Sequence, residues 1–175
     1  MKIAVCGSGT QVFQNIAEKA FIIGRLLARK NVLVLTGAGL GYPYYAAKGA
    51  FSDSGTVVGI SPAESKEEHI AKYKFMTDAF TSIEYTSMGI PGRNYALIKE
   101  ADAVIIIGGQ IGTLNEFSIA FHENKPIAVL KESGGITSLI PNIAEICDTS
   151  KQNTIIYEAE PEMLVEKIIA AISHS

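Results

Sequence analysis

The sequence predicts an α/β protein with a doubly wound, mostly parallel sheet (Rossmann-like) that carries helices on both faces. Short, nearly all-apolar segments alternate with longer segments whose apolar residues recur at helical spacing. Strands that helices cover on both faces are apolar on both sides, so these short segments suit a buried parallel sheet. Glycine-rich turns follow several of them, where ligands bind in sheets of this kind.

The first part of the chain repeats the order of strand, turn and helix. Pro43 suits the first turn of a helix, because the N–H group that proline lacks would have no helical partner there. The predicted elements are a strand at 2–6, a helix that ends near residue 31, a strand at 32–35, a helix at 43–52 and a strand at 56–60.

Residues 63–80 interrupt this alternation. Ser65 followed three residues later by Glu68 has the spacing of a capping box, which predicts the start of a short helix. The charges of this segment are expected to form a solvated face. A lid over a pocket is the alternative.

The alternation then resumes and continues to the end of the chain. The predicted elements are a strand at 82–86, a helix at 93–101, a strand at 103–107, a helix that reaches residue 124, a strand at 127–130, a short helix at 137–146, a strand at 154–157 and a terminal helix from Pro161. No repeat, linker or low-complexity segment divides the chain, which predicts a single Rossmann-like nucleotide-binding domain over residues 1–175.

Composition narrows the class of protein. Hydrophobic residues make up 47% of the chain and charged residues 19%, and the formal net charge is −3. Nothing here has the basic character of a nucleic-acid-binding protein. No apolar run approaches the length of about 18 residues that spans a membrane, and the first strand is too short for a signal peptide, so we expect a cytoplasmic protein.

Cysteines and histidines give no sign of a metal site or a disulfide. Cys6 and Cys147 are far apart and have no Cys-x-x-Cys spacing. The three histidines (His69, His122 and His174) are scattered and are expected at the surface. We therefore expect neither a metal nor a cofactor.

The stretch 108–116 is the strongest candidate for a binding site. It joins the apolar strand 103–107 to the next helix through a glycine-rich turn. The first N–H groups of a helix lack helical partners and carry the positive end of its dipole, so they suit a phosphate. The alternative is structural, because Thr113 and Glu116 have the spacing of a capping box that only closes the helix.

Two further glycine-rich turns, at residues 7–10 and 36–41, are expected to converge on the same crevice. Neither turn matches the G-x-G-x-x-G dinucleotide fingerprint, since Val12 and Tyr42 replace the third glycine. No Walker-type phosphate loop and no Gly-x-Ser-x-Gly elbow occur in the sequence. These absences argue against a nicotinamide enzyme, a nucleoside triphosphatase and an α/β-hydrolase.

Arg93 is expected in the first turn of its helix, after Pro91 and Gly92. A cation is disfavoured there by about 0.3–1 kcal/mol, so its presence suggests that it serves a phosphate or a carboxylate in the crevice. The alternative is an arginine that only pairs with Glu116 or another acidic neighbour.

These residues carry a resemblance to a known family. The stretch 36–41, the pair Arg93-Asn94 and the stretch 108–116 resemble the "lonely guy" phosphoribohydrolases of the lysine-decarboxylase-like superfamily, which carry a PGGxGTxxE motif. The resemblance runs from the first strand to about Leu130. A branch of uncharacterised Rossmann-like proteins related to the DNA-processing protein DprA is closer still, and it also resembles molybdenum cofactor carrier proteins.

By position, the resemblance implies that Arg93 and Glu116 are catalytic and that Gly112 and Thr113 bind phosphate. Together with the three turns, it makes the candidate nucleotide- and phosphate-binding residues Gly7, Ser8, Gly9, Gly37, Ala38, Gly39, Gly41, Asn94, Gly109, Gln110, Ile111, Gly112 and Thr113.

The sequence departs from the family motif at three positions. Gly108 stands where the family has proline, Gln110 replaces its second glycine, and Asn94 replaces its lysine. The phosphate turn is expected to survive Gln110 if the φ angle there is negative. The loss of the lysine puts the identity of the substrate in question.

Two functions are compatible with this sequence. The first is a phosphoribohydrolase that splits a nucleoside 5′-monophosphate into free base and ribose 5-phosphate, with Arg93 keeping Glu116 ionised. The second is a non-catalytic protein that binds or carries a nucleotide or a molybdenum cofactor, with Glu116 as a capping residue. Both imply a small phosphorylated ligand and exclude nucleic acid and membrane as partners, and the resemblance implies a homodimer.

Overall fold

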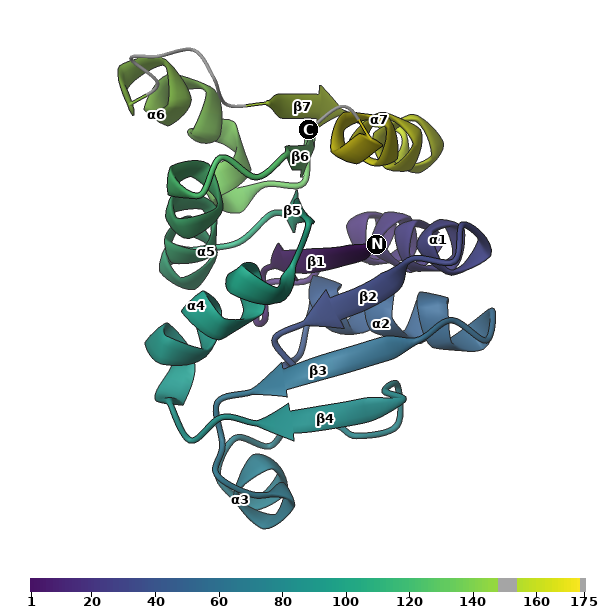
Figure 1. Cartoon of the computed structure of the whole chain (residues 1–175), viewed down its shortest axis with the longest axis vertical. Helices are drawn as coiled ribbons and strands as arrows, with labels where there is room; N and C mark the ends of the chain where they lie inside the picture. Colours follow the sequence, from purple (N-terminus) through teal and green to yellow (C-terminus); the bar gives the residue numbers. More distant parts are fainter. Residues whose placement is uncertain (148–153, 174–175) are drawn as a thin grey trace.

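The computed structural model describes residues 1–147 and 154–173. Its strands form one seven-stranded sheet in the order β4-β3-β2-β1-β5-β6-β7 (Figure 1), and every neighbouring pair is parallel. The predicted Rossmann-like α/β fold is confirmed. The strands are β1 (Lys2–Gly7), β2 (Leu33–Thr36), β3 (Val57–Ser61), β4 (Ser82–Tyr85), β5 (Ala103–Ile107), β6 (Ile127–Leu130) and β7 (Ile155–Glu158).

The helices lie between the strands in the chain. They are α1 (Gln14–Arg29), α2 (Tyr42–Ser52), α3 (Lys66–Ala71), α4 (Gly89–Glu100), α5 (Ile111–His122), the 3-10 helix η1 (Gly135–Ser138), α6 (Ile140–Cys147) and α7 (Pro161–Ser173). Within the part of the chain that is described, no helix has the length and hydrophobicity needed to cross a membrane.

Strand β1 shows why the sheet is buried on both faces. Successive side chains of a strand point to opposite faces. Ile3 and Val5 belong to one hydrophobic cluster, and Ala4 and Cys6 belong to the other. All four are at most 1% exposed, so each face of the sheet has its own core.

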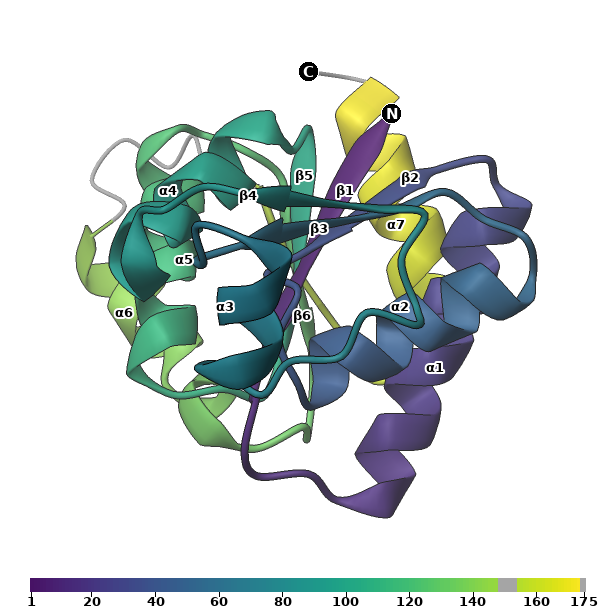
Figure 2. The same cartoon turned by 90° about the horizontal axis from the view of Figure 1, so that it is seen from below.

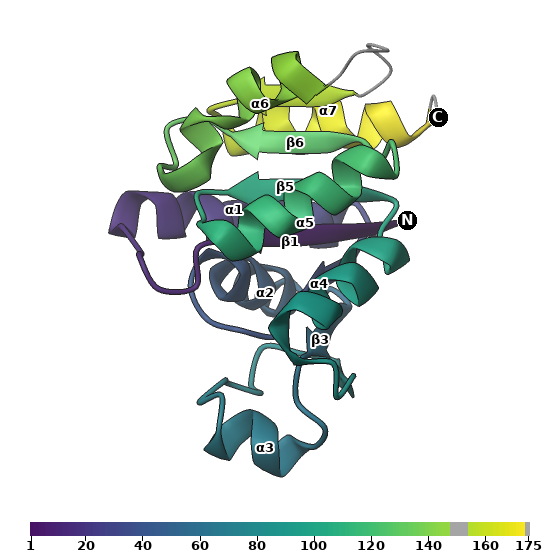
Figure 3. The same ribbon diagram turned by 90° about the vertical axis from the view of Figure 1, so that its left-hand side faces the viewer.

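The helices form two layers, one on each face of the sheet. Helices α1, α2 and α7 pack on the face of Ile3 and Val5, and α4 and α5 contribute to the cluster on the opposite face. Figures 1 and 2 show these two layers on either side of the strands, and Figure 3 shows α4, α5 and α6 in front of the sheet. Helix α3 belongs to neither layer and lies beyond the β3–β4 edge.

The strand order reverses between β1 and β5. From β1 the chain proceeds through β2 and β3 to β4 at one edge, and it then crosses back to β5 and continues to β7. The turns after β1 and β5 therefore leave in opposite directions and open a crevice between them. Any ligand site is expected at this point.

Helix α4 begins four residues earlier than predicted, at Gly89 instead of Arg93. Pro91 lies in its first turn, where a missing N–H group costs no helical hydrogen bond. Arg93 is consequently one turn inside the helix, and the argument that placed it at the unfavourable end of the dipole was wrong. Its role must be judged from its contacts.

Helix α5 also begins earlier than a capping box would require. Gln110 is the N-cap residue and makes no side-chain capping hydrogen bond, and Thr113 and Glu116 both lie inside the helix. The alternative that these two residues close the helix was wrong. The predicted helix at 137–146 is divided into η1 and α6.

The expectation for the histidines was wrong for one of them. His122 is exposed, but His69 in α3 is fully buried. His174 lies outside the described residues. The prediction of a short helix capped by Ser65 is confirmed, since Ser65 Oγ accepts a hydrogen bond from Glu68 N–H at 3.2 Å.

Candidate functional site

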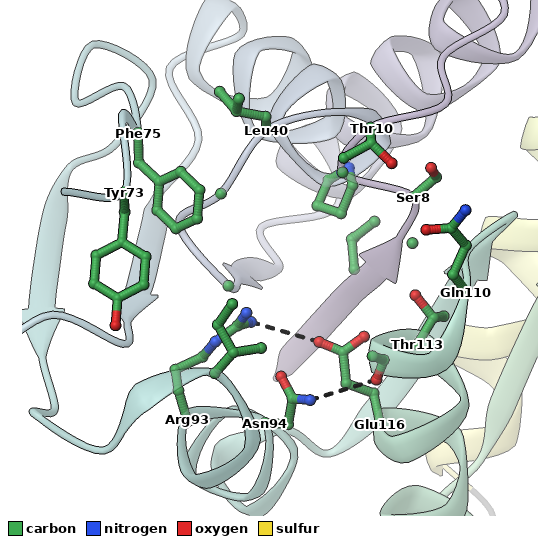
Figure 4. Close-up of a pocket in the computed structure, with 18 residues that line it drawn as sticks. Ser8, Thr10, Leu40, Tyr73, Phe75, Arg93, Asn94, Gln110, Thr113 and Glu116 are labelled. Carbon is green, nitrogen blue, oxygen red and sulfur yellow. Dashed lines mark hydrogen bonds and ion pairs between the residues drawn. The ribbon is translucent and has the colours of Figure 1, made fainter. Parts of the chain in front are cut away.

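A pocket of about 430 Å³ opens at the carboxyl ends of β1 and β5 (Figure 4). It is lined by residues of all three glycine-rich turns, by two residues of the segment after α3, and by side chains of α4 and α5. The turns that are far apart in sequence therefore do meet. The β1–β5 pairing brings Gly7 opposite Ile107, which places the first and third turns side by side.

The amino end of α5 borders this pocket through Gly112 and Thr113, and its first backbone N–H groups have no partner within the helix. The first hydrogen bond of the helix joins Leu114 N–H to Gln110 O at 2.9 Å, so the N–H groups of residues 111–113 precede the helical ladder. A Cβ built on Gly112 meets no atom within 4 Å, which shows that this glycine borders open space. The φ angle of Gln110 is −132°, so this residue can replace the glycine of the family motif without strain in the turn. This end of the helix can accept an anion.

The turn before α5 depends on glycine at residue 108. Its φ is +59°, a left-handed conformation that proline cannot adopt. Its N–H group also donates to Ser133 Oγ at 2.8 Å, and Ser133 in turn donates to Leu130 O at 2.6 Å. The proline that the family motif has at this position is therefore incompatible with this turn. In this chain, the segment 133–137 stabilises the turn instead.

The first and second turns are also locked together. Gly41 has a φ of +73°, and a Cβ there would be 1.9 Å from Ser8 O. Tyr42 N–H donates to the same carbonyl at 2.9 Å. Ser8 itself is buried, and its hydroxyl accepts a hydrogen bond from Gln11 N–H at 3.0 Å.

Arg93 is buried in the floor of the pocket. Only 8% of the residue is exposed, and its Nε has no hydrogen-bond partner among the described residues. The guanidinium lies against Gly37, because a Cβ at that position would be 1.7 Å from Nη1. An unpaired donor at this depth costs free energy, and it belongs to a charged side chain that lines the pocket.

Glu116 faces Arg93 across the floor, and Nη1 and Oε1 are 3.5 Å apart. Burial raises the pKa of Glu116 to about 7, although Arg93 and a hydrogen bond with the Cys6 thiol act to lower it. Arg93 therefore favours the ionised form of Glu116, but burial acts more strongly and leaves part of the carboxyl protonated at neutral pH. Burial also raises the pKa of Cys6 well above its usual value, with the Glu116 charge as the next cause.

Asn94 is oriented by α5. It is 2% exposed, and its Nδ2 donates to Asn115 Oδ1 at 2.9 Å and to Gly112 O at 3.4 Å. Its Oδ1 has no partner in the described part of the chain. Where the resembling family has a charged lysine, this chain has a neutral amide that ties α4 to the amino end of α5.

Most predicted site residues lie in the pocket wall. Four predicted residues do not line it. Ala38 is fully buried and packs towards Gly59, and Ile111 is 79% exposed outside the wall. The other two, Gly41 and Gly109, pack against neighbouring parts of the protein. The predicted residues that line the pocket are Gly7, Ser8, Gly9, Gly37, Gly39, Arg93, Asn94, Gln110, Gly112, Thr113 and Glu116.

Sequence reasoning did not identify the apolar part of the wall. Tyr73 and Phe75 come from the segment that interrupts the alternation of strands and helices, and Leu40, Pro43 and Ile90 border the same space. The sequence signal that could have identified this part of the wall is the pair of aromatic residues, two positions apart, in an irregular segment. The alternative that residues 63–80 form a lid over a pocket pointed to this segment. The expectation of a solvated charged face is met by Lys66 and Glu67, which are exposed.

Among residues 1–147 and 154–173, no group of three or more His, Cys, Asp or Glu side chains is placed to hold a metal ion.

Known proteins resemble this chain along most of its length. An uncharacterised protein of Archaeoglobus fulgidus is 34% identical over 132 residues, which cover 75% of this chain and 80% of that protein. The structure of the molybdenum cofactor binding protein from Rippkaea orientalis is similar with a TM-score of 0.82 and 27% identity, over 98% of this chain and 96% of that one.

DNA processing protein A from Helicobacter pylori has the same fold. Its TM-score is 0.68 at 18% identity, over 98% of this chain and 81% of that chain. Its structure was described for a single-stranded DNA binding mode, but at this identity the likeness concerns the fold alone. The profile of the SLOG cluster4 family matches residues 1–165, and the chain belongs to that family.

Proposed function

We propose that this protein binds a small phosphorylated ligand of the nucleoside monophosphate class and hydrolyses its N-glycosidic bond. The observation that carries the proposal is the buried Arg93–Glu116 pair beside the free N–H groups at the amino end of α5. The pair supplies a fixed positive charge and a carboxyl that can hold or release a proton near neutral pH.

The phosphate is proposed to bind at Gly112 and Thr113, in the first turn of α5. Backbone N–H groups and the helix dipole favour a negative charge there. Gly112 leaves the space that a Cβ would fill, and the positively charged Arg93 side chain lines the same pocket. A phosphorylated ligand would pair with this charge and with the first N–H groups of α5.

Glu116 is proposed to carry the chemistry. With a pKa of about 7, a fraction of the carboxyl groups is protonated at neutral pH. The protonated form would donate to the departing nitrogen of the base as the bond from C1′ to nitrogen breaks. The resulting carboxylate would stabilise the cationic ribose, and it would then take a proton from the water that attacks C1′. The products are free base and ribose 5-phosphate.

The second candidate is a non-catalytic binding or carrier protein for a nucleotide or a molybdenum cofactor. The likeness to the molybdenum cofactor binding protein from Rippkaea orientalis, along almost the whole of both chains, favours it. In that case the pocket holds its ligand by the same anion-binding groups, and Glu116 only neutralises Arg93.

The test is incubation of the purified protein with nucleoside monophosphates, with release of free base followed by chromatography. Glu116→Gln keeps the size of the side chain and removes its acid–base function. The matched control is Glu123→Gln, which alters an exposed carboxylate at the other end of α5. We expect release by the wild type and the control, and none by Glu116→Gln, which should still bind nucleotide.

Release that is equal in Glu116→Gln and the wild type would contradict the catalytic role. No release by any variant, with nucleotides still raising the melting temperature, would favour the carrier. If neither nucleotides nor ribose 5-phosphate change the melting temperature, the proposal of a phosphorylated ligand fails.

Three further expectations remain proposals. We propose that the chain is a single domain, that it forms a homodimer, and that it does not bind nucleic acid. Light scattering tests the second proposal, because it measures the association state. Titration with single-stranded DNA at low salt tests the third, because electrostatic contacts with phosphates are strongest at low salt.

A further inference from the structure

The pocket has two ends of different chemistry. On one side lie the polar groups of the turns and the amino end of α5, including Ser8, Gln110 and Thr113 (Figure 4). On the other side lie Tyr73 and Phe75, which the segment after α3 brings to the pocket. A ligand that fills this space would be charged at one end and flat and apolar at the other.

Tyr73 and Phe75 form a partly exposed aromatic pair. Their ring centroids are 5.5 Å apart with an interplanar angle of 33°. The Phe75 ring faces the second glycine-rich turn, since a Cβ on Gly39 would be 3.5 Å from its Cζ. Neither ring is buried in the core, so both keep surface available for a planar partner.

His69 holds this pair in position. Phe75 N–H donates to His69 O at 3.2 Å, and the imidazole meets the Phe75 ring edge-on, with centroids 5.5 Å apart at 73°. A carbonyl can only accept, so it is Nε2–H of His69 that donates to Met76 O at 3.1 Å. Nδ1 lies 2.9 Å from Ser61 Oγ at the end of β3. The buried ring therefore ties the aromatic segment to the sheet.

Arg93 and Glu116 lie in the floor between the two ends (Figure 4). A ligand with its anion at α5 and its ring beside Phe75 would place the bond that joins these two parts over this pair. The arrangement has the order that cleavage of a base from a sugar phosphate requires.

We propose that Tyr73 and Phe75 are the platform for the heterocyclic ring of the ligand, and that His69 is the residue that positions them. This inference rests on the proposed function, because it assumes that the phosphate binds at α5. Aromatic side chains stack on the flat faces of bases in general, so the platform selects for a ring more than for one particular base.

The test compares ligands with and without a ring. Affinities for the four common nucleoside monophosphates and for ribose 5-phosphate are measured by calorimetry in the wild type, Phe75→Leu and Tyr73→Leu, each carrying Glu116→Gln so that no nucleotide is cleaved during the titration. Leucine keeps apolar bulk but removes the flat face. The matched control is Phe51→Leu, at a phenylalanine that is 46% exposed on α2 and outside the pocket.

We expect the tightest nucleotide to lose about tenfold or more in affinity in each platform variant, with ribose 5-phosphate changed less than about twofold. The control should leave both affinities unchanged. His69→Gln, whose amide can still donate to Met76 O, should lose affinity for the nucleotide but not for ribose 5-phosphate.

Each outcome decides something. If the wild type binds nucleotides no more tightly than ribose 5-phosphate, or if the platform variants weaken both ligands equally, the platform is overturned while phosphate binding stands. If His69→Gln affects neither ligand, its positioning role is overturned. If the wild type binds neither class of ligand, the proposed function itself fails.

Discussion

The guanidinium of Arg93 occupies the space that a side chain at residue 37 would need, so that a Cβ on Gly37 would lie 1.7 Å from Nη1. Gly37 lies in the turn directly after β2, and Arg93 belongs to α4, so the contact joins two elements that are far apart in the sequence. The missing side chain of the glycine is thus what lets the arginine reach the floor of the pocket.

Gly37→Ala should displace Arg93 and weaken nucleotide binding by about tenfold. The same substitution in an Arg93→Ala background should cost nothing further in affinity, because the group with which the methyl collides is gone. Calorimetry on the four proteins of this double-mutant cycle measures the coupling. Additive losses would mean that Gly37 acts independently of Arg93.

Gly112→Ala should separate stability from binding. Alanine is favoured over glycine inside a helix by about 0.5–1 kcal/mol, and the new Cβ meets no protein atom within 4 Å, so the free energy of unfolding should rise. The same methyl group enters the proposed phosphate site and should lower affinity for ribose 5-phosphate.

Ser118→Ala is the matched control for Gly112→Ala, because Ser118 is exposed on the same helix and does not line the pocket. It should change stability without a change in affinity. Urea denaturation and calorimetry measure the two quantities. Unaltered binding in Gly112→Ala would place the phosphate elsewhere.

The stability contributed by Glu116 should depend on pH. Burial raises its pKa in the folded protein from the usual 4.5 to about 7, so the folded state favours the protonated carboxyl. The wild type should therefore be most stable relative to Glu116→Gln below about pH 4.5, and this advantage should be lost as the pH rises to about 7. The shift corresponds to roughly 3 kcal/mol.

Urea denaturation of both proteins at pH 5 and pH 8 measures this difference. A gap between them that does not change with pH would contradict the buried, neutral carboxyl. If Glu116 acts as the proposed acid, kcat/KM for base release should also fall above about pH 7, because the donor is then ionised.

Ser133→Ala should destabilise the turn at residue 108. The hydroxyl of Ser133 is the acceptor for Gly108 N–H at 2.8 Å, and Ser133 is only 3% exposed, so its removal leaves a buried N–H group unpaired. The expected loss is about 1–3 kcal/mol in the free energy of unfolding. Ser138→Ala, which removes an exposed hydrogen bond to Gly135 O, should cost much less.

Local pattern was a good guide to the elements and a poor one to their ends. The apolar run 103–107 predicts β5 without error, because a strand that is buried on both faces tolerates few polar residues. The start of α4 was missed by four residues, at Gly89 instead of Arg93. Pro91 and Gly92 look like a helix stop, yet both are acceptable in a first turn, where the backbone needs no partner.

The buried state of His69 was not visible in the sequence for a different reason. Its partners are Ser61, Met76 and the Phe75 ring, and they surround it only after the segment that follows α3 folds back against the end of β3. The position of Tyr73 and Phe75 in the pocket wall depends on the same fold-back and was missed for the same reason.

The sequence by itself determined the class of fold, the three glycine-rich turns and the two residues, Arg93 and Glu116, on which the chemistry is proposed to depend. These follow from periodicity and local backbone requirements, which act over a few neighbouring residues. Only the tertiary structure decided that the Arg93 guanidinium packs against Gly37, that burial raises the pKa of Glu116 to about 7, and that Tyr73 and Phe75 line the same pocket as the amino end of α5. Burial and charge at a point depend on every element packed around it, and those elements meet only when the sheet is assembled.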